Sequence, residues 1–129
     1  MSGDKAKILL VEDNIALSGV IHFNLTRAGY QVTAVGNGRE AIAALERGQF
    51  DLVLSDQQMP KMTGIQLCEH IREMPDHVHT PFILLTAKCM EIDVAKLRQR
   101  LGVSMALPKP FSPSELLTCI EESLASRVG

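Results

Sequence analysis

The segment KILLVEDNIALSGVIHFNLTRAG, residues 7–29, sets a pattern that the rest of the chain repeats. It begins with a short and almost entirely apolar run, Lys7–Val11, which is typical of a strand buried on both faces of a parallel sheet. An amphipathic helix is predicted over Asn14–Ala28, because apolar residues recur there at helical spacing. Gly29 then lies where a left-handed helix cap is expected. The segment therefore predicts one β-strand followed by one α-helix.

The same strand-then-helix pattern occurs four more times along the chain. Strands are predicted over residues 31–35, 52–56, 82–86 and 105–107, and helices over 37–47, 63–73, 89–101 and 113–127. Residues 75–81, bounded by two prolines, are predicted to form a loop. Cap residues at Asn37, Thr63 and Ser112 are each followed three positions later by Glu or Gln, the spacing of a capping box. Five such units predict an open, doubly wound parallel α/β sheet, because a barrel needs about 250 residues.

Length and charge limit the domain count and the classes of partner. The 129 residues, with a mass of 14.1 kDa, are expected to form one domain over residues 1–129, with a core over about 6–127 and no effector domain. A net charge of −2 and a pI near 6.1 argue against direct nucleic-acid binding. No apolar run approaches the ~18 residues of a membrane span, and the N-terminus lacks the layout of a signal peptide.

The cysteines and histidines give little sign of a disulfide framework or a transition-metal site. Cys68, Cys89 and Cys119 are odd in number, widely spaced and without a CxxC motif, so each is expected to act as a small hydrophobic residue. His77 and His79 share the predicted loop, but no third ligand stands at a suitable spacing. This use of cysteine predicts a reducing, cytoplasmic setting.

Polar residues that suit phosphate chemistry follow four of the five predicted strands. They are Glu12 and Asp13, Asp56, Thr86 and Lys109. Ligands of open α/β sheets bind at the carboxyl ends of the strands, so these groups are expected to meet. Three carboxylates suit Mg²⁺, a hydroxyl and a lysine can hold phosphoryl oxygens, and an aspartate can itself accept a phosphoryl group. Each carboxylate alone could equally be a helix cap, but the set predicts a phosphate-and-magnesium site.

Four segments of the chain resemble the CheY-like receiver domain of two-component response regulators. They are ILLVEDN (Ile8–Asn14), LVLSDQQMPKMTG (Leu52–Gly64), ILLTAK (Ile83–Lys88) and LPKPF (Leu107–Phe111). The combination of D-x-x-M-P-x-M-x-G with K-P-F is specific to that family, and the resemblance extends over essentially the whole chain. It implies a flavodoxin-like (βα)5 doubly wound parallel sheet with strand order 2-1-3-4-5.

The resemblance also implies a metal site and an acceptor. Asp56 would be the phosphorylated aspartate. Glu12 and Asp13 would hold Mg²⁺, or Mn²⁺, together with Asp56 and the backbone carbonyl of Gln58. No other cofactor is implied.

Further roles follow for residues around the acceptor. Thr86 would be the switch hydroxyl that moves toward the phosphoryl group, and Lys109 would pair with a phosphoryl oxygen. The Lys109–Pro110 peptide bond would be cis. Gln58 and Lys88 occupy positions that tune the lifetime of the phosphoryl group in this family.

The function implied is a phosphoacceptor switch rather than an enzyme for an external substrate. The chain would take a phosphoryl group from the phosphohistidine of a sensor histidine kinase, or from a phosphotransfer protein, onto Asp56, and would lose it slowly by self-dephosphorylation. The fourth predicted helix, the fifth strand and the fifth helix would form a face that binds an unidentified downstream protein, and a homodimer is compatible with this reading. Neither nucleic acid nor membrane is an expected partner.

Two residues depart from the family pattern, and two alternative functions stand beside the receiver, the first of them suggested by Ala106. Ala106 stands where many receivers carry a Tyr or Phe that moves with the switch threonine, and Thr63 stands where many carry Asp. One alternative is a docking module of the same fold that works without phosphorylation. The other is a Mg²⁺-dependent phosphohydrolase, although such enzymes usually present D-x-D near the first strand rather than a lone aspartate such as Asp56 on the third.

Overall fold

The computed structural model describes residues 6–126, which form a five-stranded parallel sheet in the order β2-β1-β3-β4-β5. This confirms the predicted doubly wound, flavodoxin-like fold. The strands are β1 (Lys7–Val11), β2 (Gln31–Val35), β3 (Leu52–Asp56), β4 (Phe82–Thr86) and β5 (Val103–Pro108). The helices are α1 (Ile15–Arg27), α2 (Gly38–Arg47), α3 (Gly64–Arg72), α4 (Val94–Leu101) and α5 (Pro113–Ser126). Residue 127, the predicted end of the last helix and of the core, lies outside the described residues.

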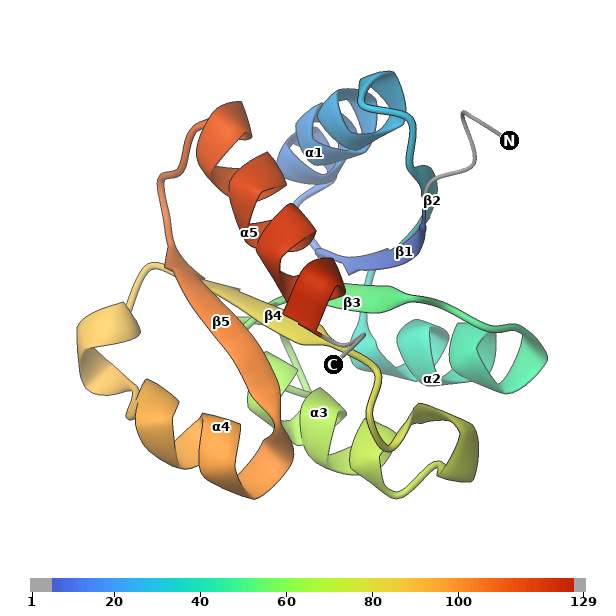
Figure 1. Ribbon diagram of the computed structural model, residues 1–129, viewed down its shortest axis with the longest axis vertical. Coiled ribbons are helices and arrows are strands. Elements are labelled where there is room, and N and C mark those ends of the chain that lie inside the picture. The colour runs from blue at the N-terminus through green and yellow to red at the C-terminus, as the bar shows by residue number, and fades with distance from the viewer. Residues whose placement is uncertain (1–5, 127–129) are drawn as a thin grey trace.

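Helices cover both faces of the sheet. Helices α1 and α5 lie on one face, and α2, α3 and α4 lie on the other (Figure 1). Successive residues of a strand point to opposite faces, so β1 contributes to two cores. Ile8 and Leu10 pack beneath α1 and α5, whereas Leu9 and Val11 pack beneath α2, α3 and α4. Burial on both faces explains why the run Lys7–Val11 is almost continuously apolar.

The three central strands bring their last residues to one level. Every residue of β3 and β4 is buried, while the edge strand β2 is half exposed. In the parallel register, Val11 of β1 pairs with Ser55 of β3, and Asp56 pairs with Leu85 of β4. The residues at the ends of β1, β3 and β4 therefore share the carboxyl edge of the sheet.

The largest differences from the sequence prediction lie in β5, in the segment before α4 and in the loop before β4. Strand β5 begins at Val103 rather than 105, because Gly102 ends α4 in a left-handed conformation (φ 68°) and the chain becomes extended at once. The predicted helix 89–101 is wrong in its first part. A separate 3₁₀ turn covers residues 89–91, and α4 starts only after Asp93, whose side chain accepts from Lys96 N at 3.0 Å. Within the loop predicted over 75–81, residues 75–77 form another 3₁₀ turn.

The caps at helix starts mostly form as predicted. Thr63 accepts from Gln66 N at 3.2 Å, and the Gln66 side chain accepts from Thr63 N at 2.9 Å, which completes a capping box at α3. The start of α5 has the same reciprocal pair. At α2, Asn37 caps Glu40 N, but the Glu40 side chain accepts from Gly36 N instead. The α3 box matters most for function, because it fixes the end of the loop that follows Asp56.

Candidate functional site

Three carboxylates meet at the carboxyl edge of the sheet. One oxygen each from Glu12, Asp13 and Asp56 lies within 4.8 Å of the others. Glu12 and Asp56 are only 3% exposed, whereas Asp13 is exposed to solvent. Negative charges this close repel one another unless a cation lies among them. We call these three residues the acidic cluster.

Lys109 opposes the acidic cluster. Its Nζ lies 2.8 Å from Asp56 Oδ1 and 3.4 Å from Glu12 Oε1. The Lys109 backbone N–H donates to Thr86 O at 3.0 Å, which fixes the start of the β5–α5 connection, and the following bond to Pro110 is cis, as expected. Burial alone would lower the pKa of Lys109, but its contacts with Asp56 and Glu12 outweigh burial and raise it. Lys109 is therefore held in its charged form.

The single positive charge of Lys109 does not balance the three negative charges of the acidic cluster. Burial raises the pKa of Glu12, the Asn14 N–H that it accepts at 3.1 Å lowers it, and the charge of Asp56 raises it further, with a net rise. Among the described residues no group donates a directed hydrogen bond to the buried Asp56 Oδ1, although Lys109 lies beside it as an ion pair. This oxygen keeps lone pairs for a cation. An all-oxygen donor set of this kind fits a hard divalent metal ion.

Thr86 and Gln58 meet at the same edge. Thr86 is fully buried at the end of β4, and its Oγ1 accepts from Gln58 Nε2 at 3.0 Å and from the Lys88 backbone N–H at 2.9 Å. The family resemblance predicts that Gln58 contacts the metal ion through its backbone carbonyl. The contact that the structure describes is made by its side chain, which nothing in the sequence signalled. The carbonyl contact stays a prediction.

The loop after Asp56 has two special backbone positions. Lys61 has a positive φ of 70°, which is unusual for a residue other than glycine, and sequence analysis did not anticipate it. A Cβ at Gly64 would lie 2.6 Å from the Asp56 carbonyl oxygen, so only glycine lets α3 start this close to the end of β3. Gln57 Oε1 accepts from Ile65 N at 2.9 Å and ties the loop to α3. The loop therefore holds Asp56 rigidly at the edge of the sheet.

Sequence comparison places this site in a known family. Residues 8–121 match the model of the response regulator receiver domain. The chain belongs to that family. As a receiver domain it is a phosphoacceptor switch, and neither a docking module that works without phosphorylation nor a phosphohydrolase is favoured.

Individual relatives agree with this placement. The alkaline phosphatase synthesis transcriptional regulatory protein PhoP of Bacillus subtilis is 36% identical over 110 residues, which are 85% of this chain and 45% of the relative. The chemotaxis response regulator CheY4 of Vibrio cholerae is 32% identical, with a TM-score of 0.82 over 92% of this chain and 98% of that one. The receiver domain of sensor histidine kinase PA1611 from Pseudomonas aeruginosa, solved with magnesium coordinated in its active site cleft, is 33% identical, with a TM-score of 0.83 over 93% and 98% of the two chains.

The receiver domain spans about half the length of the curated relatives that it matches, between 45% and 52%. At the position of the usual switch aromatic it has Ala106, which is half buried and packs against the core beneath α2, α3 and α4. Among residues 6–126, no helix is long and apolar enough to cross a membrane.

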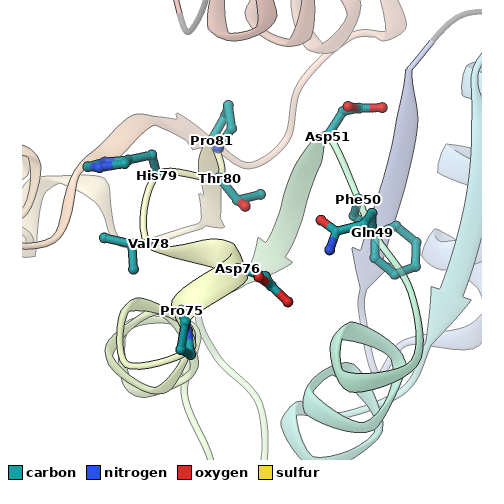
Figure 2. Close-up of a pocket in the computed structure, with 9 residues that line it drawn as sticks. All are labelled: Gln49, Phe50, Asp51, Pro75, Asp76, Val78, His79, Thr80 and Pro81. Carbon is teal, nitrogen blue, oxygen red and sulfur yellow. The ribbon is translucent and has the colours of Figure 1, made fainter.

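A hollow lies at the edge of the sheet opposite to the acidic cluster. It measures about 380 Å³ and is formed by the segments that precede β3 and β4 (Figure 2). Its polar groups do not converge. The His79 ring points away from Asp76 (Figure 2). Asp51 Oδ2 already accepts a hydrogen bond from Lys7 N at 2.8 Å. This hollow offers no chemistry comparable with that of the acidic cluster.

His77, Cys68 and Cys119 are all buried in the part of the chain that the structure describes. His77 is 1% exposed, and its ring nitrogens lie 3.2 Å from Leu45 O and 3.1 Å from Thr80 Oγ1, so neither is left for a metal. Cys68 and Cys119 are free thiols buried in the core. The side chain of Cys89 lies outside those that the structure describes.

Proposed function

We propose that this receiver domain accepts a phosphoryl group on Asp56, with Mg²⁺, or Mn²⁺, held by the acidic cluster and the backbone carbonyl of Gln58. One observation carries the proposal. Asp56 is one of the two buried members of a carboxylate cluster at a sheet edge, and it is the one whose Oδ1 lies 2.8 Å from an ammonium yet lacks a directed hydrogen bond within the described residues. A carboxylate in that position is held in place beside Lys109, and its negative charge is only partly neutralised.

The chemistry follows from these groups. A carboxylate oxygen of Asp56 attacks the phosphorus of a phosphohistidine, a P–O bond forms, and the P–N bond breaks with its electron pair passing to the imidazole nitrogen. The metal ion, when bound, neutralises charge on the transferring oxygens. Lys109, held in its charged form, pairs with a phosphoryl oxygen, and Thr86 supplies a hydroxyl from the neighbouring strand. Water attack on the acyl phosphate later returns the carboxylate.

The output of the switch is proposed to be a change in protein binding. Phosphorylation shifts the population between two conformations, so the phosphoryl group needs to favour one of them by only a few kcal/mol. Movement of Thr86 would reach the face formed by α4, β5 and α5. That face has a hollow of about 360 Å³ lined by Arg98 of α4, Met105 of β5 and Glu122 of α5, which suits a downstream protein or a second copy in a homodimer.

The phosphoryl donor and the cellular compartment are part of the same proposal. The phosphoryl donor is a sensor histidine kinase or a phosphotransfer protein, and the compartment is the cytoplasm, in keeping with the free buried thiols of Cys68 and Cys119. Neither direct nucleic-acid nor membrane contact by the described residues is proposed. Residues 6–126 act as one receiver domain.

Incubation with acetyl phosphate and Mg²⁺ tests the proposal. Intact mass spectrometry should show one added phosphoryl group, stable in acid and labile in base. Asp56→Asn should abolish the gain, and Asp76→Asn, the same change at the exposed opposite edge of the sheet, should leave it intact. Absence of the gain in the wild-type chain, or equal modification of Asp56→Asn, would refute the assignment. Continuous release of phosphate from varied phosphomonoesters would instead indicate a phosphohydrolase.

A further inference from the structure

The side chain of Gln58 is bonded to the hydroxyl on which the proposed switch depends. Gln58 lies in the loop after β3, and Thr86 ends the adjacent strand β4. Gln58 Nε2 lies 3.0 Å from Thr86 Oγ1, and Gln58 Oε1 lies 3.2 Å from the same oxygen. Whichever way the amide is turned, it therefore faces the hydroxyl with a donor or an acceptor.

The Thr86 hydroxyl has several hydrogen-bonding partners in this arrangement. A threonine hydroxyl has one proton and two lone pairs. The Lys88 backbone N–H donates to Thr86 Oγ1 at 2.9 Å, and the Gln58 amide supplies a second donor and a nearby acceptor. Thr86 is fully buried whereas Gln58 is exposed. The amide can reorient into water at little cost, but the buried hydroxyl then loses its hydrogen bonds to the amide.

We propose that the Gln58 side chain is a latch that holds the Thr86 hydroxyl in the unphosphorylated position. The inference rests on the proposed function, in which Thr86 turns toward a phosphoryl group on Asp56. That movement breaks the bonds to the Gln58 amide, so the latch stabilises the unphosphorylated conformation alone. Gln58 is then a positioning residue, which acts on the phosphoryl group through Thr86 and sets the balance between the two conformations.

The latch is separable from metal binding. The proposed metal contact uses the backbone carbonyl of Gln58, which any residue at this position retains. A Gln58→Met variant keeps the length of the side chain and removes both hydrogen-bonding groups. Gln49→Met is the matched control, because Gln49 is an exposed glutamine at the opposite edge of the sheet.

The first measurement uses the unphosphorylated protein. In a ¹⁵N–¹H spectrum without metal or phosphoryl analogue, Thr86→Val should shift the side-chain amide signals of Gln58 and leave those of Gln49 in place. Unchanged Gln58 signals would show that the bond is absent in solution and would overturn the latch, whatever the outcome of phosphorylation.

The second measurement is the affinity for beryllofluoride in the presence of Mg²⁺, with beryllofluoride as a stand-in for the phosphoryl group. A neutral hydrogen bond contributes a net stabilisation that corresponds to roughly a 2- to 12-fold change in an equilibrium constant. Gln58→Met should therefore bind beryllofluoride about 2- to 12-fold more tightly than wild type, and Gln49→Met should bind as wild type does. In a Thr86→Val background, Gln58→Met should have no further effect.

The outcomes separate the latch from the proposed function. If wild type binds beryllofluoride but Gln58→Met binds equally or more weakly, the latch is wrong and the phosphoacceptor assignment stands. The latch is also wrong if Gln58→Met tightens binding equally in the Thr86→Val background. If wild type does not bind beryllofluoride, the proposed function fails, and the spectrum of the unphosphorylated protein still decides whether Gln58 holds Thr86.

Discussion

Neutralising Asp13 should make the metal-free protein more stable. Asp13 is the exposed member of the acidic cluster, and an oxygen from each of Glu12 and Asp56 lies within 4.8 Å of it. Lys109 makes its contacts with Glu12 and Asp56 rather than with Asp13. Asp13→Asn therefore removes two repulsions while both described ion pairs of Lys109 stay in place.

The expected gain follows from Coulomb's law. Two unit charges 4.8 Å apart repel by about 0.9 kcal/mol at the dielectric constant of water and by about 3.5 kcal/mol at an effective value of 20. Because Asp13 is exposed, solvent screens it and the lower figure applies to each of its two neighbours. Attraction to the more distant charge of Lys109 offsets part of the sum. The net gain should be about 1 kcal/mol, or about 4 °C in Tm for a chain of this length.

Urea unfolding with and without Mg²⁺ measures this gain. Without the metal, Asp13→Asn should unfold at a higher urea concentration than wild type, and 0.5 M NaCl should reduce the difference by screening. With Mg²⁺, wild type should gain more stability than the variant, because the ion binds the folded cluster and the variant has lost one ligand. Asp76→Asn is the control and should change stability by less than about 0.5 kcal/mol.

Two results would refute the reasoning. One is a metal-free Asp13→Asn protein that is no more stable than wild type. The other is an equal stabilisation of both proteins by Mg²⁺, which would show that Asp13 takes no part in holding the ion.

Three further predictions concern residues around the site and in the core. Gly64→Ala should lower stability by about 1–3 kcal/mol in urea unfolding and should slow labelling by acetyl phosphate, because the added Cβ would lie 2.6 Å from the Asp56 carbonyl oxygen. A variant with the stability and labelling rate of the wild type would contradict this close packing. His77→Ala should lower the free energy of unfolding by about 2–4 kcal/mol in the same assay, since the buried ring loses its packing and both hydrogen bonds. The control His79→Ala, at an exposed position, should lower it by less than about 0.5 kcal/mol. Equal effects of the two substitutions would argue against the buried position of the His77 ring. Burial raises the pKa of Cys68 to about 11, so at pH 8 roughly one thiol in a thousand is ionised, and mass spectrometry should find it unmodified by iodoacetamide until the protein unfolds; rapid native labelling would disagree.

The order and type of the main elements could be predicted because the signals are local and agree with one another. Residues 8–11 of the run Lys7–Val11 are buried between the two layers of helices, and the Thr63 cap forms with its predicted partner. The proximity of the three carboxylates and Lys109 could be predicted because the carboxyl ends of parallel strands share one edge. Strand order, which spacing leaves open, came from the family resemblance.

The missed features depend on packing or on backbone geometry that residue type does not encode. The start of α4 is the exception, because Asp93 is a residue type that caps helices and lies inside the predicted helix 89–101. The positive φ of Lys61 arises from the tight loop before Gly64, and lysine carries no such preference. The bond from Gln58 to Thr86 joins the loop after β3 to the end of β4, between residues 28 positions apart, and depends on a side-chain orientation that only the folded chain determines.

The central claim is that Asp56, and no other carboxylate of the cluster, accepts the phosphoryl group. Borohydride reduces an acyl phosphate of aspartate to homoserine, so treatment after reaction with acetyl phosphate and Mg²⁺ marks the acceptor permanently. Tandem mass spectrometry of the digested protein should then find homoserine at position 56 and unmodified residues at positions 12 and 13. Homoserine at position 13, or no homoserine in a protein that has gained the mass of a phosphoryl group, would contradict the account.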